Sequence, residues 1–217
     1  SATVHFPIWH QEIEDILVLK NNKGTEDNRV RKLDYSIQLS KLFYERFINN
    51  EDITLFSPHD VPGLYDAFGT DAFDDLYKTY ELDGSIPKKT IGGQELLLDL
   101  LKERAETGRV YIMNIDHCND HSSFKDKVNM SNLCQEITLP TTPLEHIDGG
   151  GEIALCILSA INVGKISKRE ELEELCDLAV RGLEELIDYQ EYPVAAAQKS
   201  TLARRSLGIG YIGLAHY

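Results

Sequence analysis

A helix that leads into a buried strand is the feature of this sequence that most constrains its fold. Residues 94–106 repeat leucine at helical spacing, and Gly108 follows them as a residue that commonly ends a helix. Residues 109–115 then form a short apolar run that is typical of a buried strand. Helices that alternate with short strands favour an α/β fold, and we expect helix to predominate in it.

The rest of the chain continues this alternation. Its patterns predict helices over 8–20, 34–48 and 168–189, one or two short helices in 63–82, a strand at 53–56, a strand or buried helix at 152–161, and the first turns of a helix at 211–217. A capping-box sequence at 167–170 should open the long helix, with Leu175, Leu183 and Leu186 on its buried face. Between these elements we expect 116–148 to be irregular and 149–151 to form a tight turn.

Composition excludes several classes of protein. The net charge is −14 over 217 residues, and no cluster of Lys and Arg is present, so the chain is a poor candidate for binding nucleic acid or an anionic membrane. No apolar run approaches the length of a membrane span, and residues 1–6 do not resemble a signal peptide. The four cysteines form no C-x-x-C pair, which favours reduced thiols in a cytoplasmic protein.

The segment 129–137 (NMSNLCQEI) carries the residues best suited to chemistry. In an extended segment, Asn132, Cys134 and Glu136 would point to one side, and Leu133 and Ile137 would point to the other side as anchors. An amide can hold a hydroxyl and a carboxylate can take its proton, while the sulfur lies between them. The carboxylate disfavours a thiolate at Cys134, which argues against an ordinary ionic nucleophile.

Three other interpretations of these side chains remain open at this point. The nine residues could be a plain strand whose polar residues have no role. A metal site could use His117, Cys118 and His121, with Cys134 or Cys156, but the spacing fits no standard zinc pattern. A cysteine hydrolase would pair Cys134 with His146 or His59, but no hydrolase signature surrounds Cys134.

The remaining polar and thiol side chains receive simpler interpretations. We interpret Cys176, on the long predicted helix, as core packing, and we assign no chemistry to Cys118. Arg204 and Arg205 could attract phosphate, but two arginines at the start of a helix more often form a solvated face. Without a partner, Cys156 would be a buried thiol in an apolar run.

The segment 129–137 closely resembles the active-site sequence S-N-L-C-x-E-I of the large subunit of class I ribonucleotide reductases. The resemblance continues along the whole chain in short segments that follow the family's order, at 17–22, 52–65, 108–109, 114–119, 151–156 and 204–210. It implies that the chain is part of the family's ten-stranded α/β barrel, incomplete here. We therefore expect 1–217 to be the central part of the catalytic barrel domain, with an active-site loop at about 128–140.

The resemblance also implies roles for individual residues. Cys134 matches the cysteine that becomes a thiyl radical and abstracts the 3′-hydrogen of a ribonucleotide. Glu136 matches the general base on the 3′-hydroxyl, and Asn132 matches the amide that binds the substrate hydroxyls. Cys156 matches one member of the redox-active pair that supplies two electrons, and its family partner would lie upstream of position 1. The resulting disulfide must then be reduced by thiol exchange.

The family's partners and cofactors follow from the same resemblance. The substrate would be a ribonucleoside diphosphate, ATP and deoxynucleotides would be effectors of the parent protein, and thioredoxin or glutaredoxin would be the external reductant. The radical would come from a small subunit with a di-iron cofactor and a tyrosyl radical, so we expect no metal on this chain. The parent subunit would be a homodimer in the cytoplasm, or in the host cytoplasm if viral.

Several family segments have no counterpart in these residues. They include the ATP-cone, most of the effector specificity site, the substrate phosphate site, the tyrosine pair of the radical path and the C-terminal redox cysteines. We therefore expect the 217 residues alone to be catalytically silent until the N- and C-terminal parts of the subunit are supplied. A non-catalytic scaffold is the alternative, which the apolar C-terminal segment favours because a helix there would need a cover.

Overall fold

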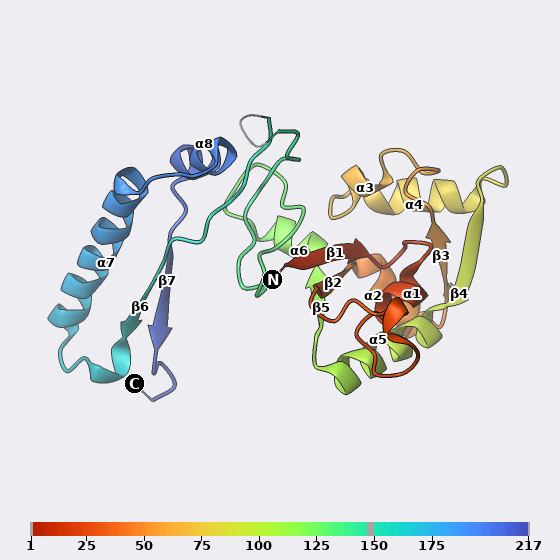
Figure 1. Cartoon of the computed structure of the whole chain (residues 1–217), viewed down its shortest axis with the longest axis horizontal. Coiled ribbons are helices and arrows are strands. Elements are labelled where there is room, and N and C mark those ends of the chain that lie inside the picture. Colours follow the sequence, from red (N-terminus) through yellow and green to blue (C-terminus); the bar gives the residue numbers. More distant parts are fainter. Residues whose placement is uncertain (1, 147–149, 217) are drawn as a thin grey trace. The chain divides into compact units, whose positions relative to one another are not determined.

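A computed structural model describes residues 2–146 and 150–216, which fall into two compact units, Ser1–Leu139 and Pro140–Tyr217 (Figure 1). The first unit contains β1 (Thr3–Pro7), α1 (Ile13–Leu17), η1 (Glu26–Asn28), β2 (Asp34–Leu39), α2 (Lys41–Asn49), β3 (Asp52–Phe56), α3 (Leu64–Ala67), α4 (Phe73–Leu82), β4 (Lys88–Gly92), α5 (Gly93–Thr107), β5 (Val110–Asn114) and α6 (Ile115–Asp120). The second contains β6 (Leu158–Asn162), η2 (Val163–Lys165), α7 (Arg169–Tyr189), α8 (Ala195–Arg204) and β7 (Gly208–Ile212).

The first unit is built on a parallel sheet in the order β1-β2-β5. Gln38 of β2 pairs with Pro7 on one side and with Met113 on the other. Parallel strands need crossover connections, and the helices between these strands supply them. The predicted helix-rich α/β fold is confirmed, and the sheets of the described residues do not close into a barrel, which is consistent with part of one.

The central strand β2 shows why the prediction of one helix over 34–48 is wrong. Residues 34–39 (DYSIQL) alternate polar and apolar side chains with the period of a strand, so Ser36 and Gln38 face one side of the sheet and Tyr35 and Ile37 face the other. Helical periodicity begins only at α2, where Leu42, Phe43 and Phe47 are buried. The apparent single helix is therefore a buried strand followed by a helix.

Aromatic side chains fill the core of the first unit between the helices and the sheet. Phe43 contacts the rings of Phe68, Phe73 and Tyr77 at centroid distances of 6.1, 5.9 and 5.5 Å. Tyr77 also donates a hydrogen bond of 2.7 Å to the Thr54 carbonyl of β3, which satisfies its buried hydroxyl. This cluster fixes α2, α4 and β3 relative to one another.

The second unit has a parallel pair, β6 and β7, and a core of few residues. Ile157, Leu183 and Ile187 are its clustered buried hydrophobic residues in the part of the chain that the structure describes. The predicted apolar face of α7 is therefore only partly buried, since Leu175 and Leu186 are 40% and 43% exposed. Helix α7 has 21 residues and is about 30 Å long, roughly twice the length of a five-residue strand. The two strands cannot cover it.

Several predicted elements are confirmed. Helix α5 ends at Gly108, which adopts a left-handed conformation with φ 64°, and β5 follows as expected. Strand β3, the two short helices α3 and α4, and the long helix α7 also lie where the patterns predict them. Gly150 and Gly151 have φ of 71° and 91°, in agreement with a turn, while residue 149 lies outside the described residues.

Other predictions are wrong for identifiable reasons. The helix expected over 8–20 is confined to α1, because the backbone at 8–11 instead bonds to Gln38 and Phe56 at the ends of β2 and β3. Of the run 152–161, predicted as a strand or buried helix, only 158–161 forms a regular element, as part of the strand β6. The irregular stretch after 115 begins with the short helix α6.

The C-terminal predictions also need correction. Residues 208–212 form β7, paired with β6, rather than the start of a helix, so no apolar helix face forms here, although Tyr211, Ile212 and Leu214 remain exposed. The expected capping box does not form as written: Lys168 is the N-cap of α7, and the Glu171 carboxylate accepts the Ser167 amide at 3.1 Å. No helix among the described residues is long and apolar enough to cross a membrane.

Candidate active site

The loop 128–140, called here the cysteine loop, contains a tight turn rather than an extended strand. The Gln135 amide donates to the Asn132 carbonyl at 3.1 Å, and Gln135 has φ of 60°. The expectation that side chains alternate along 129–137 is therefore wrong, and Leu133 is 40% exposed instead of anchored in a core. Cys134 lies inside the turn, between its first and last residues.

Hydrogen bonds hold the start of the cysteine loop against the first unit. Asn119 of α6 donates to the Val128 carbonyl at 3.0 Å and accepts from the Val128 amide at 2.8 Å. Gln38 of β2 donates from Nε2 to the Asn129 carbonyl at 2.7 Å. Two consecutive residues of the loop are thus fixed before the turn begins.

The turn itself is held on the neighbouring strands. From β1, Thr3 Oγ1 donates to the Leu133 carbonyl at 2.7 Å, and His5 Nε2 lies 3.1 Å from the Ser131 carbonyl. Gln135 Nε2 donates to the Ile112 carbonyl of β5 at 2.7 Å. Together with Gln38, these bonds connect the loop to all three strands of the sheet, on the side that carries its polar residues.

A second set of hydrogen bonds closes the turn on itself. Asn132 Oδ1 accepts from the Ile137 amide at 3.1 Å, and the Ser131 hydroxyl donates to the Ile137 carbonyl at 2.5 Å. The two arms of the turn are therefore joined on either side of Cys134. Asn132 is half-buried, which orients its amide, whereas Cys134 and Glu136 are exposed.

Three of the four predicted site residues therefore lie close together in the cysteine loop, Asn132 and Cys134 in the turn and Glu136 directly after it. Cys134 is a free thiol open to solvent, with Asn132 and Glu136 two residues away on either side. Cys156 lies in the second unit, shortly before β6, and is exposed rather than buried as its apolar surroundings predicted. Cys176 is half-buried on α7 and not part of a closed core.

Burial shifts the pKa values of His5 and Cys118, which lie near the loop. It lowers the pKa of His5 against the opposing effect of its hydrogen bond to Ser131, so the imidazole is neutral at neutral pH. Burial, with the charge of Asp116, raises the pKa of Cys118, which keeps this thiol protonated. A thiol that stays protonated is consistent with our interpretation that Cys118 has no chemical role.

The metal and hydrolase interpretations gain no support. The rings of His117 and His121 lie 6.1 Å apart, and no group of three or more His, Cys, Asp or Glu within the described ranges could hold a metal ion. The histidine that contacts the cysteine loop is His5, and it binds the backbone of Ser131 rather than the thiol. His59 is exposed in the turn after β3.

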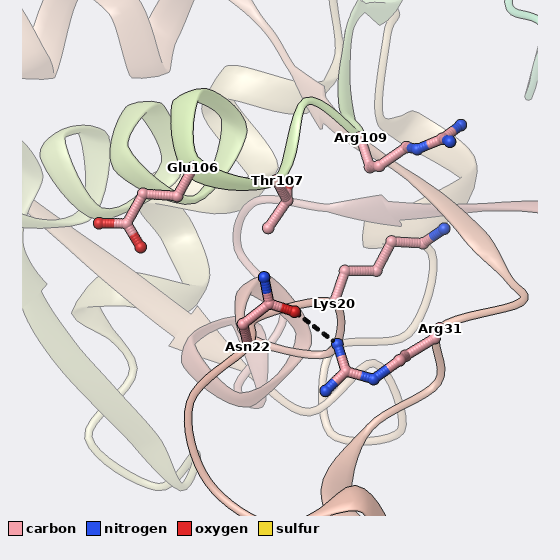
Figure 2. A pocket seen from close by; sticks show the side chains of 6 residues that line it. All are labelled: Lys20, Asn22, Arg31, Glu106, Thr107 and Arg109. Carbon is pink, nitrogen blue, oxygen red and sulfur yellow. Dashed lines mark hydrogen bonds between the residues drawn. The ribbon is translucent and has the colours of Figure 1, made fainter.

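A polar cavity of about 200 Å³ lies apart from the cysteine loop, at the starts of β2 and β5 (Figure 2). Its basic side chains come from three segments, and two of them already have acidic partners: Lys20 contacts Asp34 at 2.5 Å and Arg31 contacts Glu26 at 2.6 Å. Arg109 is exposed. The ion pairs explain how this region is held together, and we assign no ligand to the cavity.

Arg204 and Arg205 have structural roles in the second unit. They lie at the end of α8 and not at the start of a helix, so the expectation of a solvated helix-start face is wrong. Arg204 pairs with Glu152 at 3.1 Å, with both side chains largely buried, and Arg205 pairs with Asp188 of α7 at 2.9 Å. The pair of Arg204 with Glu152 joins two segments that the family resemblance singled out, 204–210 and 151–156.

The supporting residues of the cysteine loop were not found from the sequence. Gln38, His5 and Thr3 come from β1 and β2, far from Cys134 in the chain. The signal that could have indicated them is the period-two alternation of 34–39, which places Ser36 and Gln38 on one polar face. Their contact with 129–133 is a tertiary feature that no local pattern encodes.

Comparisons with known proteins show the family to which the chain belongs. The family model for the ribonucleotide reductase barrel domain matches residues 1–217. The chain is 60% identical to a ribonucleoside-diphosphate reductase subunit alpha of Haemophilus influenzae and 55% identical to one of Escherichia coli K12, in each case over its whole length. A subunit alpha of Enterobacteria phage T4 is 44% identical over 97% of the chain. The chain spans only 30%, 29% and 28% of these relatives.

Proposed function

The chain belongs to the ribonucleotide reductase barrel-domain family, and from this premise we propose that it carries the catalytic centre of a ribonucleoside-diphosphate reductase large subunit. One observation carries the proposal: Asn132, Cys134 and Glu136 lie within five consecutive residues of the cysteine loop, which hydrogen bonds hold on three strands. We infer that both compact units belong to the same barrel domain, which the match over 1–217 supports.

The first chemical step in this proposal is a hydrogen-atom transfer to Cys134. The Cys134 thiyl radical forms an S–H bond while the C3′–H bond of the ribonucleotide breaks, and the unpaired electron moves to C3′. A solvent-open thiol in a rigid turn suits this step, because the sulfur must meet a substrate atom at a defined position.

Glu136 and Asn132 act on the substrate hydroxyl groups in the same proposal. The exposed Glu136 carboxylate takes the proton of the 3′-hydroxyl as general base. The Asn132 amide, oriented by the bond between its Oδ1 and the Ile137 amide, holds a substrate hydroxyl. The cysteine loop therefore supplies a hydrogen-atom acceptor, a base and a binding group within five consecutive residues.

Reduction at C2′ needs two electrons, which we assign to a pair of thiols that includes Cys156. Two thiols lose two hydrogens and become a disulfide, the C2′–OH group leaves as water, and C2′ gains hydrogen. The hydrogen on the Cys134 sulfur then returns to C3′, which restores the thiyl radical. A second thiol system, thioredoxin or glutaredoxin, then reduces the disulfide by exchange. The exposure of Cys156 supports this role, since exchange requires access to the sulfur.

The proposal includes partners that lie outside these residues. The described side chains offer no set of three or more metal ligands, so they do not fit a di-iron centre. We place that cofactor, with its tyrosyl radical, on a separate small subunit. ATP and deoxynucleotide effectors, the remaining N- and C-terminal parts of the subunit, a homodimeric parent and a cytoplasmic location complete the proposal.

Reconstitution tests the function as a whole. A full-length subunit containing these residues is mixed with its small subunit, a dithiol and CDP, and dCDP is measured together with thiol oxidation. We expect one dCDP for each pair of thiols oxidised, and none when the small subunit is omitted. Product that forms without the small subunit would contradict the radical mechanism. Glu136→Gln should reduce the rate by roughly 100-fold or more, because the general base is lost.

A further inference from the structure

The buried amide of Gln38 is an unusual feature of the parallel sheet. Gln38 lies in the central strand β2 and is 1% exposed. A buried amide is costly unless its hydrogen bonds are made. Its Nε2 donates to the Asn129 carbonyl at 2.7 Å and also lies 3.6 Å from the Met113 sulfur. The strong partner is thus a backbone group of the cysteine loop, 91 residues away in the chain.

Ser36 provides an internal comparison on the same face of the same strand. It lies two residues before Gln38, is fully buried, and its hydroxyl has no hydrogen-bond partner among the described residues. A polar side chain at this face therefore does not automatically contact the loop. The contact is specific to Gln38, whose longer side chain reaches the Asn129 carbonyl.

We propose that Gln38 is a positioning residue for Cys134, acting through the carbonyl of Asn129. The inference rests on the proposed function of Cys134. Asn119 fixes Val128 from α6, and Gln38 fixes the next residue from the sheet, so the arm that leads to the turn begins at a defined point. Thr3 fixes Leu133, the neighbour of Cys134, from the adjacent strand β1.

The expected consequence is a defined distance between the sulfur and C3′. Without the Gln38 donor, the Asn129 carbonyl loses its hydrogen bond to β2, and the arm of the turn can shift away from the sheet. A displacement of about 1 Å at a reacting atom can reduce a rate by roughly 100-fold. We assign the Asn129 carbonyl no contact with the substrate, so we expect the effect to fall on the hydrogen-transfer step.

Gln38→Met in the full-length holoenzyme tests the proposal, because methionine keeps the length and burial of the side chain but cannot donate. Relative to wild type, we expect kcat for CDP reduction to fall about 10-fold to 100-fold, while KM changes less than about twofold. The deuterium isotope effect on kcat with 3′-deuterated CDP should rise, because hydrogen transfer becomes slower. Loss of stability alone would not change this isotope effect.

Two further variants keep the test decisive. Ser36→Ala removes a buried polar group from the same face without touching the loop, and its kcat should stay within about twofold of wild type. Thr3→Val removes the bond to Leu133 at a more accessible position, and we expect it also to lower kcat. It replaces Gln38→Met as the test if Gln38→Met folds poorly. The melting temperature of each variant is measured alongside.

The outcomes distinguish failure of the positioning role of Gln38 from failure of the proposed function of the chain. An unchanged kcat and isotope effect in Gln38→Met would overturn the positioning role, as would a fall in kcat of equal size in Ser36→Ala. Failure of the wild-type holoenzyme to form dCDP would instead overturn the proposed function of the chain. A large rise in KM with unchanged kcat would also overturn the positioning role, because it would make Gln38 a residue of substrate binding.

Discussion

The two units of this chain bury their hydrophobic side chains to very different extents. The first packs an aromatic cluster of Phe43, Phe68, Phe73 and Tyr77 against a sheet whose central strand is buried on both faces. The second, as far as the structure describes it, clusters a few buried residues under α7 and leaves Leu178 and Tyr211 64% and 59% exposed. Both units nevertheless contain predicted site residues.

The difference in packing corresponds to a difference in how firmly the backbone around Cys134 and around Cys156 is held. The cysteine loop belongs to the well-packed unit, where hydrogen bonds from β1, β2 and α6 hold its backbone. Cys156 lies in the sparsely packed unit, in a segment without regular structure before β6. A hydrogen-atom transfer demands fixed geometry, whereas thiol–disulfide exchange demands access and movement of sulfur atoms.

The largest expected effect is the loss of aromatic packing in the first unit. Phe43→Ala should lower the free energy of unfolding by about 3 to 5 kcal/mol, because it leaves a cavity among rings that cannot collapse into it. Trp9 is the single tryptophan and is fully buried in this unit, so its fluorescence in a urea titration follows the transition. Leu183→Ala in the second unit should cost only about 2 kcal/mol, measured by hydrogen exchange in α7. Equal losses of unfolding free energy in Phe43→Ala and Leu183→Ala would contradict the difference in packing between the two units.

An intermediate effect is expected from the ion pair between Arg46 and Glu81. The two side chains are only 10% and 17% exposed and make two contacts of 2.5 and 2.6 Å. Arg46→Met leaves the Glu81 carboxylate without its cation, and we expect a loss of about 3 kcal/mol in the same urea titration. The control is Arg181→Met on α7, whose pair with Asp177 is largely exposed and should contribute less than about 0.5 kcal/mol.

The smallest effect concerns pH and His5. Burial holds the pKa of His5 below its unfolded value near 6.5, so the unfolded chain binds more protons as the pH falls. The stability contributed by neutral His5 is therefore present above about pH 6.5 and decreases below it. His5→Phe should reduce this decrease between about pH 7.5 and pH 5, measured by urea midpoints. An unchanged pH dependence would show that His5 is not desolvated.

Local signals in the sequence predicted much of the fold. Helix α5, its end at Gly108 and strand β5 followed from periodicity and a helix-stop residue. Strand β2 was missed because its period-two pattern runs directly into the helical pattern of α2. The C-terminal strand β7 was missed because its conformation depends on pairing with β6, which is a tertiary contact.

The candidate site was likewise predicted only where local sequence signals exist, and not where it depends on tertiary contacts. Cys134, Glu136 and Asn132 were identified from residue chemistry and a family resemblance, and their roles stay predictions. The turn at 132–135 could not be predicted, because a glutamine with positive φ carries no sequence signal of the kind that glycine gives. The contact between Gln38 and Asn129 joins residues 91 positions apart, which no short-range pattern can reveal.

The most direct test of the central claim is a pair of cysteine variants in the reconstituted holoenzyme. Cys134→Ser should abolish dCDP formation from CDP while substrate binding is retained, because a serine hydroxyl cannot replace the thiol as hydrogen-atom carrier. The matched control is Cys118→Ser, at a half-buried thiol of α6 to which we assign no chemistry, and it should retain activity. Formation of dCDP by Cys134→Ser at a rate near that of wild type would contradict the assignment of Cys134 as the radical cysteine.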